Sequence, residues 1–137
     1  MAVNYLASLR TNRMNLVVNA LGTATGPTIS VTGTAAGTLV IGTSALSGAT
    51  GVLATITLNT TPATVSGNVL TLSGVPLSAT ASATGTAALA ELRNNAGTVI
   101  VSGLTVGTSG TDIIISSTAI TSGQTVQVTS GTITHAA

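Results

Sequence analysis

The spacing of apolar residues divides the chain into two parts. In residues 4–21 the apolar positions recur every three or four residues, which predicts an α-helix with one apolar stripe, interrupted by Arg13. The stripe consists of Leu6, Leu9, Leu16, Val17, Ala20 and Leu21. Asn4 is a favourable capping residue for the start of this helix, and Gly22 stands where a glycine often ends one. After Gly22 the period changes to two, which indicates β-strands.

Several later segments alternate apolar residues with threonine, serine or other polar residues. This alternation predicts strands with one face in the core, and the branched side chains of Thr, Val and Ile favour the extended backbone. The alternating segments are 28–32, 52–58, 68–72 and 125–129. Segments 38–41 and 112–115 instead contain uninterrupted apolar runs, which are typical of strands buried on both faces.

Two other segments suggest how strands are connected. Asn94-Asn95-Ala96-Gly97 is typical of a turn, and we expect it to join 86–93 and 98–102 in a β-hairpin. Segment 78–88 is rich in Ala, Ser and Thr, so it fits either a tightly packed strand, which we favour, or a linker.

Together these patterns predict a mainly β protein. About eight to ten short strands separated by Gly and Pro favour an antiparallel β-sandwich or a jelly-roll-like barrel, with one N-terminal α-helix. We expect a single domain, in which the helix occupies residues 4–21 and a β-rich region occupies residues 28–135.

The composition excludes most chemistry. The chain of 137 residues has no Cys and no Lys, and 4% of its residues are charged, where about 25% is usual. A lysine-containing phosphate loop, a Schiff base, a disulfide and a cysteine metal site are therefore excluded. Three arginines do not make the basic surface that nucleic-acid binding requires. We expect neither nucleic acid nor a membrane among the partners.

Catalytic residues are equally scarce. His135 is the one histidine, and we interpret it as an exposed residue near the chain end. The composition alone does not exclude a Ser-His-Asp triad, but the chain lacks the Gly-x-Ser-x-Gly turn. We therefore expect no catalytic residues, no metal site, no cofactor and no enzyme activity. The first residues also do not resemble a secretion signal, and no apolar run is long enough for a membrane span, so we expect a cytoplasmic protein or a particle assembled in the cytoplasm.

The shortage of charge has a consequence for the surface. A soluble monomer usually carries about 25–35% charged residues outside, whereas this chain must expose Thr, Ser, Gly and Ala. Its edge strands also lack the Lys or Glu residues that discourage pairing with other molecules. We therefore expect a subunit of a larger assembly and a homo-oligomer, most simply a trimer.

The predicted helix holds the candidate contact residues. Arg10 and Arg13 are three residues apart and share one helix face, so they suit contact with an acidic partner surface. They equally suit a solvated face or ion pairs with Glu91 or Asp112. Tyr5, the one aromatic residue, is a candidate for the same contact, although a packing role in the core is the simpler interpretation.

Parts of the chain resemble a known family. Leu6-Ala7-Ser8-Leu9-Arg10-Thr11-Asn12-Arg13-Met14 is similar to the Leu-Arg-x-x-Arg helix that opens small virion structural proteins encoded beside the head genes of tailed bacteriophages. Segments similar to the later strands of that family are 85–87, 91–93, 107–112, 119–128 and 132–135. The family often has aromatic residues before the arginine of its middle strand, where this chain has Glu91-Leu92.

The resemblance implies a role in the virion. It implies a head decoration, or cement, protein that contacts the major capsid protein or other virion proteins, and it brings no catalytic residues with it. A tail, neck or fibre component is the alternative within the virion. A glycan-binding or ice-binding β-domain is a further alternative, since Thr-x-Thr occurs at 23–25, 32–34, 55–57 and 132–134.

Overall fold

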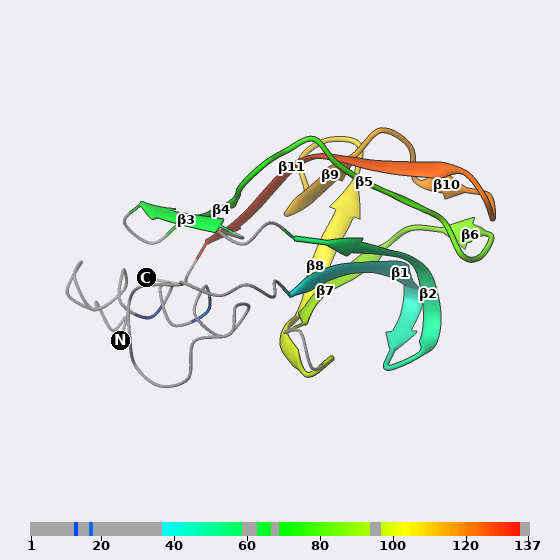
Figure 1. Cartoon of the computed structure of the whole chain (residues 1–137), viewed down its shortest axis with the longest axis horizontal. Helices are drawn as coiled ribbons and strands as arrows, with labels where there is room; N and C mark the ends of the chain where they lie inside the picture. Colours follow the sequence, from blue (N-terminus) through cyan, green and yellow to red (C-terminus); the bar gives the residue numbers. More distant parts are fainter. Residues whose placement is uncertain are drawn as a thin grey trace.

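A computed structural model of the chain describes residues 13, 17, 37–58, 63–66, 69–93 and 97–134. These residues form eleven β-strands (Figure 1). The strands are β1 (Thr38–Ser47), β2 (Thr50–Thr57), β3 (Ala63–Ser66), β4 (Val69–Leu72), β5 (Leu77–Thr80), β6 (Gly85–Thr86), β7 (Leu89–Arg93), β8 (Val99–Gly107), β9 (Ile113–Ile115), β10 (Ala119–Ile120) and β11 (Thr125–Thr134). The mainly β fold predicted from the sequence is confirmed.

Nine of the strands form one mixed sheet. Its order is β2-β1-β7-β8-β9-β11-β4-β3, and β5 pairs with β11 beside that path. β6 and β10 form a separate two-stranded sheet. Neighbouring strands are antiparallel except β8 and β9, which are parallel. The described strands do not close into a barrel, so they do not form the predicted jelly-roll-like barrel.

The large sheet bends so that its two halves face each other. In Figure 1, β1, β2 and β7 lie below, β5, β9 and β11 lie above, and β8 runs between the two groups. The apolar core lies between these groups, where it joins Leu39 and Ile56 from one side to Ile113 and Val128 from the other. Residues far apart in the sequence therefore share one core.

The two uninterrupted apolar runs behave differently. In β1 the consecutive residues Leu39, Val40 and Ile41 are at most 1% exposed, so this strand is buried on both faces as predicted. In β9, Ile113 and Ile115 are buried but Ile114 is half-buried, so the same prediction holds for β9 only in part.

Gly42 lies in β1 where its pairing with β2 becomes irregular. A Cβ atom added to Gly42 would lie 2.6 Å from the carbonyl oxygen of Gly51 and 2.6 Å from Leu46 Cδ1. The backbone of Gly51 has φ +72°, a conformation that glycine adopts readily. The close approach of β1 and β2 at this point therefore requires a glycine at position 42.

We expect Gly42→Ala to lower the free energy of unfolding by about 1–2 kcal/mol, because the added methyl group overpacks a contact with backbone atoms. Urea denaturation of the variant and the wild type measures the difference. Gly48→Ala is the control for a general effect of alanine in this hairpin, because a Cβ at Gly48 meets nothing within 4 Å, although its φ of +58° adds some strain. An unchanged free energy of unfolding in Gly42→Ala would contradict close packing at this position.

Other predictions differ in their outcome. The predicted β-hairpin is confirmed, because the strands on either side of residues 94–97, β7 and β8, pair antiparallel. Leu89 lies opposite Thr105, and Arg93 lies opposite Val99. Segment 78–88 forms a strand only in part: β5 ends at Thr80, and β6 covers just two residues. β3 is a strand that the sequence pattern did not predict.

The interruption after β5 has a backbone cause. The N–H of Ala81 still donates to the carbonyl of Gln124 at 2.7 Å, but the N–H of Ser82 donates to the carbonyl of Leu53 at 2.8 Å. The chain therefore leaves β11 and passes to the edge of β2.

The predicted helix at 4–21 and the predicted strand at 28–32 lie outside the described residues, apart from Arg13 and Val17. Both of these residues have helical backbone conformation. Val17, a residue of the predicted apolar stripe, is half-buried and packs against the core of the β-region.

Candidate functional site

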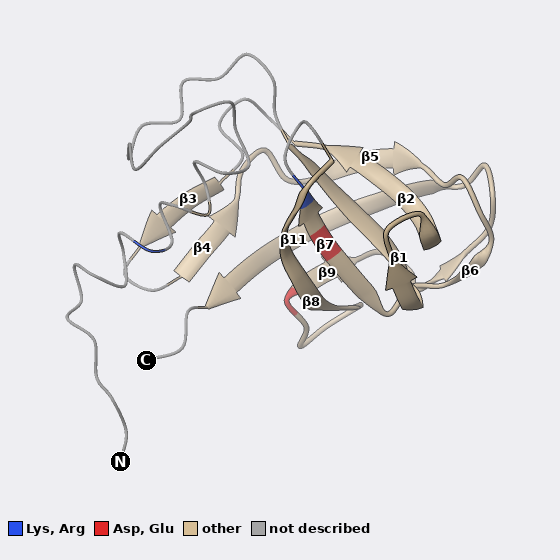
Figure 2. Cartoon of the chain, turned by 90° about the horizontal axis from the view of Figure 1, so that it is seen from below, with Lys and Arg blue, Asp and Glu red and all other residues tan. Residues whose placement is uncertain are grey.

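Most side chains of this molecule are apolar or carry a hydroxyl group, and the few charged side chains are the exceptions. The chain has 3 basic and 2 acidic residues, and the structure describes four of them: Arg13, Glu91, Arg93 and Asp112. None of these four is exposed; Glu91 is buried and the other three are half-buried. Figure 2 shows how sparse they are on the described strands. The contacts of these four groups are therefore the candidates for a functional site.

Glu91 and Arg93 form the most developed polar cluster among the described residues. They alternate along β7 with Ala90 and Leu92, which are in the core, so both charged side chains emerge on the opposite face of the sheet. Nε and Nη2 of Arg93 both donate to Oε2 of Glu91, at 3.1 and 2.7 Å. Burial of the two side chains is extensive, at 15% exposure for Arg93 and 10% for Glu91.

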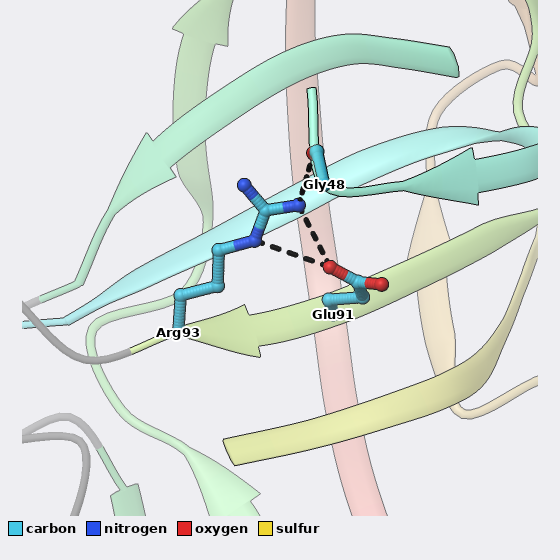
Figure 3. Close-up of polar contacts among 3 residues, drawn as sticks. All are labelled: Gly48, Glu91 and Arg93. Atoms are coloured by element: carbon cyan, nitrogen blue, oxygen red, sulfur yellow. Dashed lines mark hydrogen bonds and ion pairs between the residues drawn. The ribbon is translucent and has the colours of Figure 1, made fainter. Parts of the chain in front are cut away.

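A third group completes this cluster. Nη2 of Arg93 also donates to the backbone carbonyl of Gly48 at 2.6 Å (Figure 3). Gly48 lies in the turn between β1 and β2, 45 residues before Arg93 in the sequence. The guanidinium group thus ties the tip of one hairpin to the face of β7. We call Gly48, Glu91 and Arg93 the arginine brace.

The hydrogen bonds and the ion pair of the arginine brace stabilise the fold. The Glu91 carboxylate accepts two hydrogen bonds from a permanently charged group, and charge-assisted bonds of this kind are stronger than neutral ones. The opposite charge on Arg93 compensates for the cost of burying Glu91. We therefore assign the brace to the positioning of the β1–β2 hairpin.

Asp112 is the second carboxylate, and it lies immediately before β9. Its Oδ2 accepts hydrogen bonds from the N–H and the hydroxyl of Thr105, both at 3.1 Å. The N–H of Asp112 in turn donates to the hydroxyl oxygen of Thr105 at 3.1 Å. These reciprocal bonds hold β8 to the loop that leads into β9.

The contact residues predicted from the sequence are only partly covered by the structure. Tyr5 and Arg10 lie outside the described residues, as does His135. Arg13 is half-buried and helical, and it belongs to neither polar cluster described above. The arginine brace is not among the sites predicted from the sequence. The available signal was the spacing of Glu91 and Arg93, because residues two apart share one face of a strand.

No built ligand site is present in the part of the chain that the structure describes. No pocket is found there. The same residues contain no group of three or more His, Cys, Asp or Glu side chains that could hold a metal ion. No described helix is long and apolar enough to cross a membrane.

Comparisons with known proteins add no assignment. Neither the protein-family models, nor the curated proteins, nor the solved structures gave a match to this chain.

Proposed function

We propose that the chain is a non-enzymatic structural protein of a bacteriophage virion, and specifically a capsid decoration, or cement, protein. The sequence resemblance to small virion proteins of tailed bacteriophages motivates this proposal. The polar clusters are consistent with it, because Arg93 engages Glu91 and Thr105 engages Asp112. Both carboxylates of the chain thus have structural partners.

The observation that carries the proposal is the uncharged exterior. None of the four charged residues that the structure describes is exposed, and the exposed positions of the described strands are dominated by threonine, serine, glycine and alanine. A surface of this kind gives little electrostatic repulsion between molecules and little net hydration by charged groups. It suits a subunit that neighbouring proteins cover, by apolar and hydroxyl contacts instead of ion pairs.

We further propose that the β-region is a β-sandwich. Its support is the shared core between the group of β1, β2 and β7 and the group of β5, β9 and β11 (Figure 1). Two layers with a common apolar interior are the usual arrangement of such folds. This compact unit would sit on the outside of the capsid shell.

The proposed partners are the major capsid protein, or other virion proteins, and further copies of this chain in a trimer. A trimer at a three-fold position would cover strand edges that the chain does not protect with Lys or Glu. The proposed helix at residues 4–21, with Tyr5, Arg10 and Arg13, would contribute to these contacts. Val17 packs against the core, which supports a helix held close to its own β-region.

A tail, neck or fibre component is the second candidate within the virion, since the uncharged surface suits any densely packed assembly. An ice-binding or glycan-binding surface has less support. Thr55 and Thr57 lie on β2 and residues 132–134 on β11, and four strands separate β2 from β11 in the sheet. These two threonine pairs therefore do not form one flat array.

Copy number on purified particles tests the proposal. A decoration protein follows the symmetry of the shell, so we expect hundreds of copies per particle. Quantitative mass spectrometry against the major capsid protein, used as the internal standard of known copy number, measures this ratio. About six or twelve copies would favour the tail or neck alternative, and absence from particles would refute both.

A further inference from the structure

Among the residues that the structure describes, β8 is an edge strand for most of its length. One edge pairs with β7: Val99 lies opposite Arg93 at one end, and Thr105 lies opposite Leu89 at the other. The other edge pairs with β9 only at Val106 and Gly107. Among the described residues, no strand pairs with this second edge between residues 99 and 104. Free backbone groups along an edge are a template for a strand from another molecule.

The side chains on this edge would favour such an addition. Val99 is 41% exposed, and Ile100 and Val101 are half-buried. Three consecutive branched apolar residues have a strong preference for the extended conformation. The charge on Arg93, which pairs with Val99, is engaged by Glu91 and the carbonyl of Gly48. The segment Val99–Val101 carries no charge of its own.

The backbone of β8 offers another form of protection. Val99 pairs with Arg93 and Val101 with Leu92, so Ile100 is an extra residue on β8. Farther along, Leu104 pairs with Ala90, so Ser102 and Gly103 lie opposite the single residue Glu91. Gly103 has φ +74°, and a Cβ there would meet nothing within 4 Å, so its role is conformational. Two bulges this close together increase the twist and interrupt the regular hydrogen-bonding edge.

The end of the free edge is closed by a side chain. The N–H of Val106 donates toward the β7 side, to the carbonyl of Ala88, so the N–H of Thr105 points to the outer edge. That N–H donates to Oδ2 of Asp112. An incoming strand that used the Thr105 N–H would have to displace this carboxylate and lie against its charge.

We propose that β8 is a guarded edge, in which the bulge at Ser102 and Gly103 and the Asp112 carboxylate prevent a second copy of this chain from adding an antiparallel strand along residues 99–105. The second copy is the relevant partner because the same Val99–Val101 segment is present on it and carries no repelling charge. This inference concerns unwanted self-association and does not depend on the proposed virion function.

The test removes both guards. Deletion of Gly103 leaves Ser102 alone opposite Glu91 and so removes the bulge at this position, while Ile100 stays an extra residue. Asp112→Ala removes the carboxylate. We expect the folded double variant to form larger oligomers than the wild type. It should do so at a protein concentration about tenfold lower than the wild type needs for the same association. Sedimentation velocity over a concentration series measures association, circular dichroism verifies the fold, and hydrogen exchange shows protection of amides 99–105 on association.

A charge placed on the edge provides the specific control. Val99→Lys in the double variant should restore wild-type sedimentation, because a lysine on an edge strand opposes pairing. Val75→Lys is the matched control, since Val75 is similarly exposed, at 38%, but lies in the loop between β4 and β5. Rescue by both lysines alike, or wild-type sedimentation of the folded double variant, would overturn the proposal.

A second variant covers failure of the deletion to fold. Asp112→Ala alone keeps the bulges and should give faster exchange at the Thr105 amide and weaker, but still increased, association. Asp112→Asn retains an acceptor for Thr105 and should fall between Asp112→Ala and the wild type. A folded Asp112→Ala protein with unchanged exchange and sedimentation would refute the guarding role of the carboxylate.

Discussion

Arg93→Met is expected to lower the free energy of unfolding by about 2–3 kcal/mol, measured by urea denaturation. The methionine retains much of the aliphatic stem but leaves Glu91 without its ion-pair partner. Removing one member of a fully buried pair costs more, about 3–5 kcal/mol, and the remaining exposure of 15% and 10% reduces the effect here. The lost bond to the carbonyl of Gly48 adds to the destabilisation.

A double-mutant cycle separates the ion pair from general packing. We expect Glu91→Gln/Arg93→Met to be more stable than the sum of the two single losses predicts, because the double variant leaves neither charge buried alone. Arg93→Lys is the conservative control: a single ammonium group keeps the charge but not the planar donor arrangement that reaches both Glu91 and Gly48, so a loss of about 1 kcal/mol is expected. Strictly additive losses in the cycle would contradict the arginine brace.

Local patterns predicted the parts of the fold that depend on neighbouring residues. The buried strand around Leu39–Ile41 and the hairpin between β7 and β8 follow from apolar runs and turn residues, which act over a few positions. The pairing of β11 with β4, β5 and β9 does not, because it joins segments that are far apart in the sequence. A period of two identifies strands but leaves their order in the sheet open.

The interruption at residues 81–84 shows the same limit at a single place. The alternation of Ala, Ser and Thr continues through this segment, but the N–H of Ser82 donates to Leu53 of β2, whereas the N–H of Ala81 donates to Gln124, just before β11. β3 was missed for another reason, since Ala63–Ser66 is a short strand that is defined by its pairing with β4. Tertiary hydrogen bonds, which leave no local signal, decide both cases.

The candidate site could have been found in part. In a chain with so few charges, Glu91 and Arg93 two residues apart in a predicted strand must share one face, and this alone indicates an ion pair. The third member was not accessible in this way. Gly48 contributes a backbone carbonyl, and its place beside Glu91 and Arg93 (Figure 3) depends on where the fold puts a turn that lies 45 residues before Arg93 in the sequence.

The proposed helix at residues 4–21 contacts the β-region through Val17. Val17 packs against the core and is half-buried, so Val17→Asp would place a charge at an apolar contact. We expect a loss of about 2–3 kcal/mol in the free energy of unfolding, measured by urea denaturation of the whole chain. Asn15→Asp is the matched control, because helical spacing puts position 15 nearly opposite position 17 and the same charge should then be tolerated.

The two outcomes of this experiment locate the apolar stripe. If the stripe packs on its own β-region, Val17→Asp weakens the fold, and any reduction in particle occupancy follows from the lower stability. If instead the stripe docks mainly on a neighbouring subunit or on the shell, Val17→Asp leaves the unfolding transition unchanged and abolishes occupancy. The observed contact between Val17 and the core favours the first outcome. In that case the helix is already fixed to the domain when Arg10 and Arg13 contact a partner. Binding through these arginines would then not include the entropy cost of ordering a free segment.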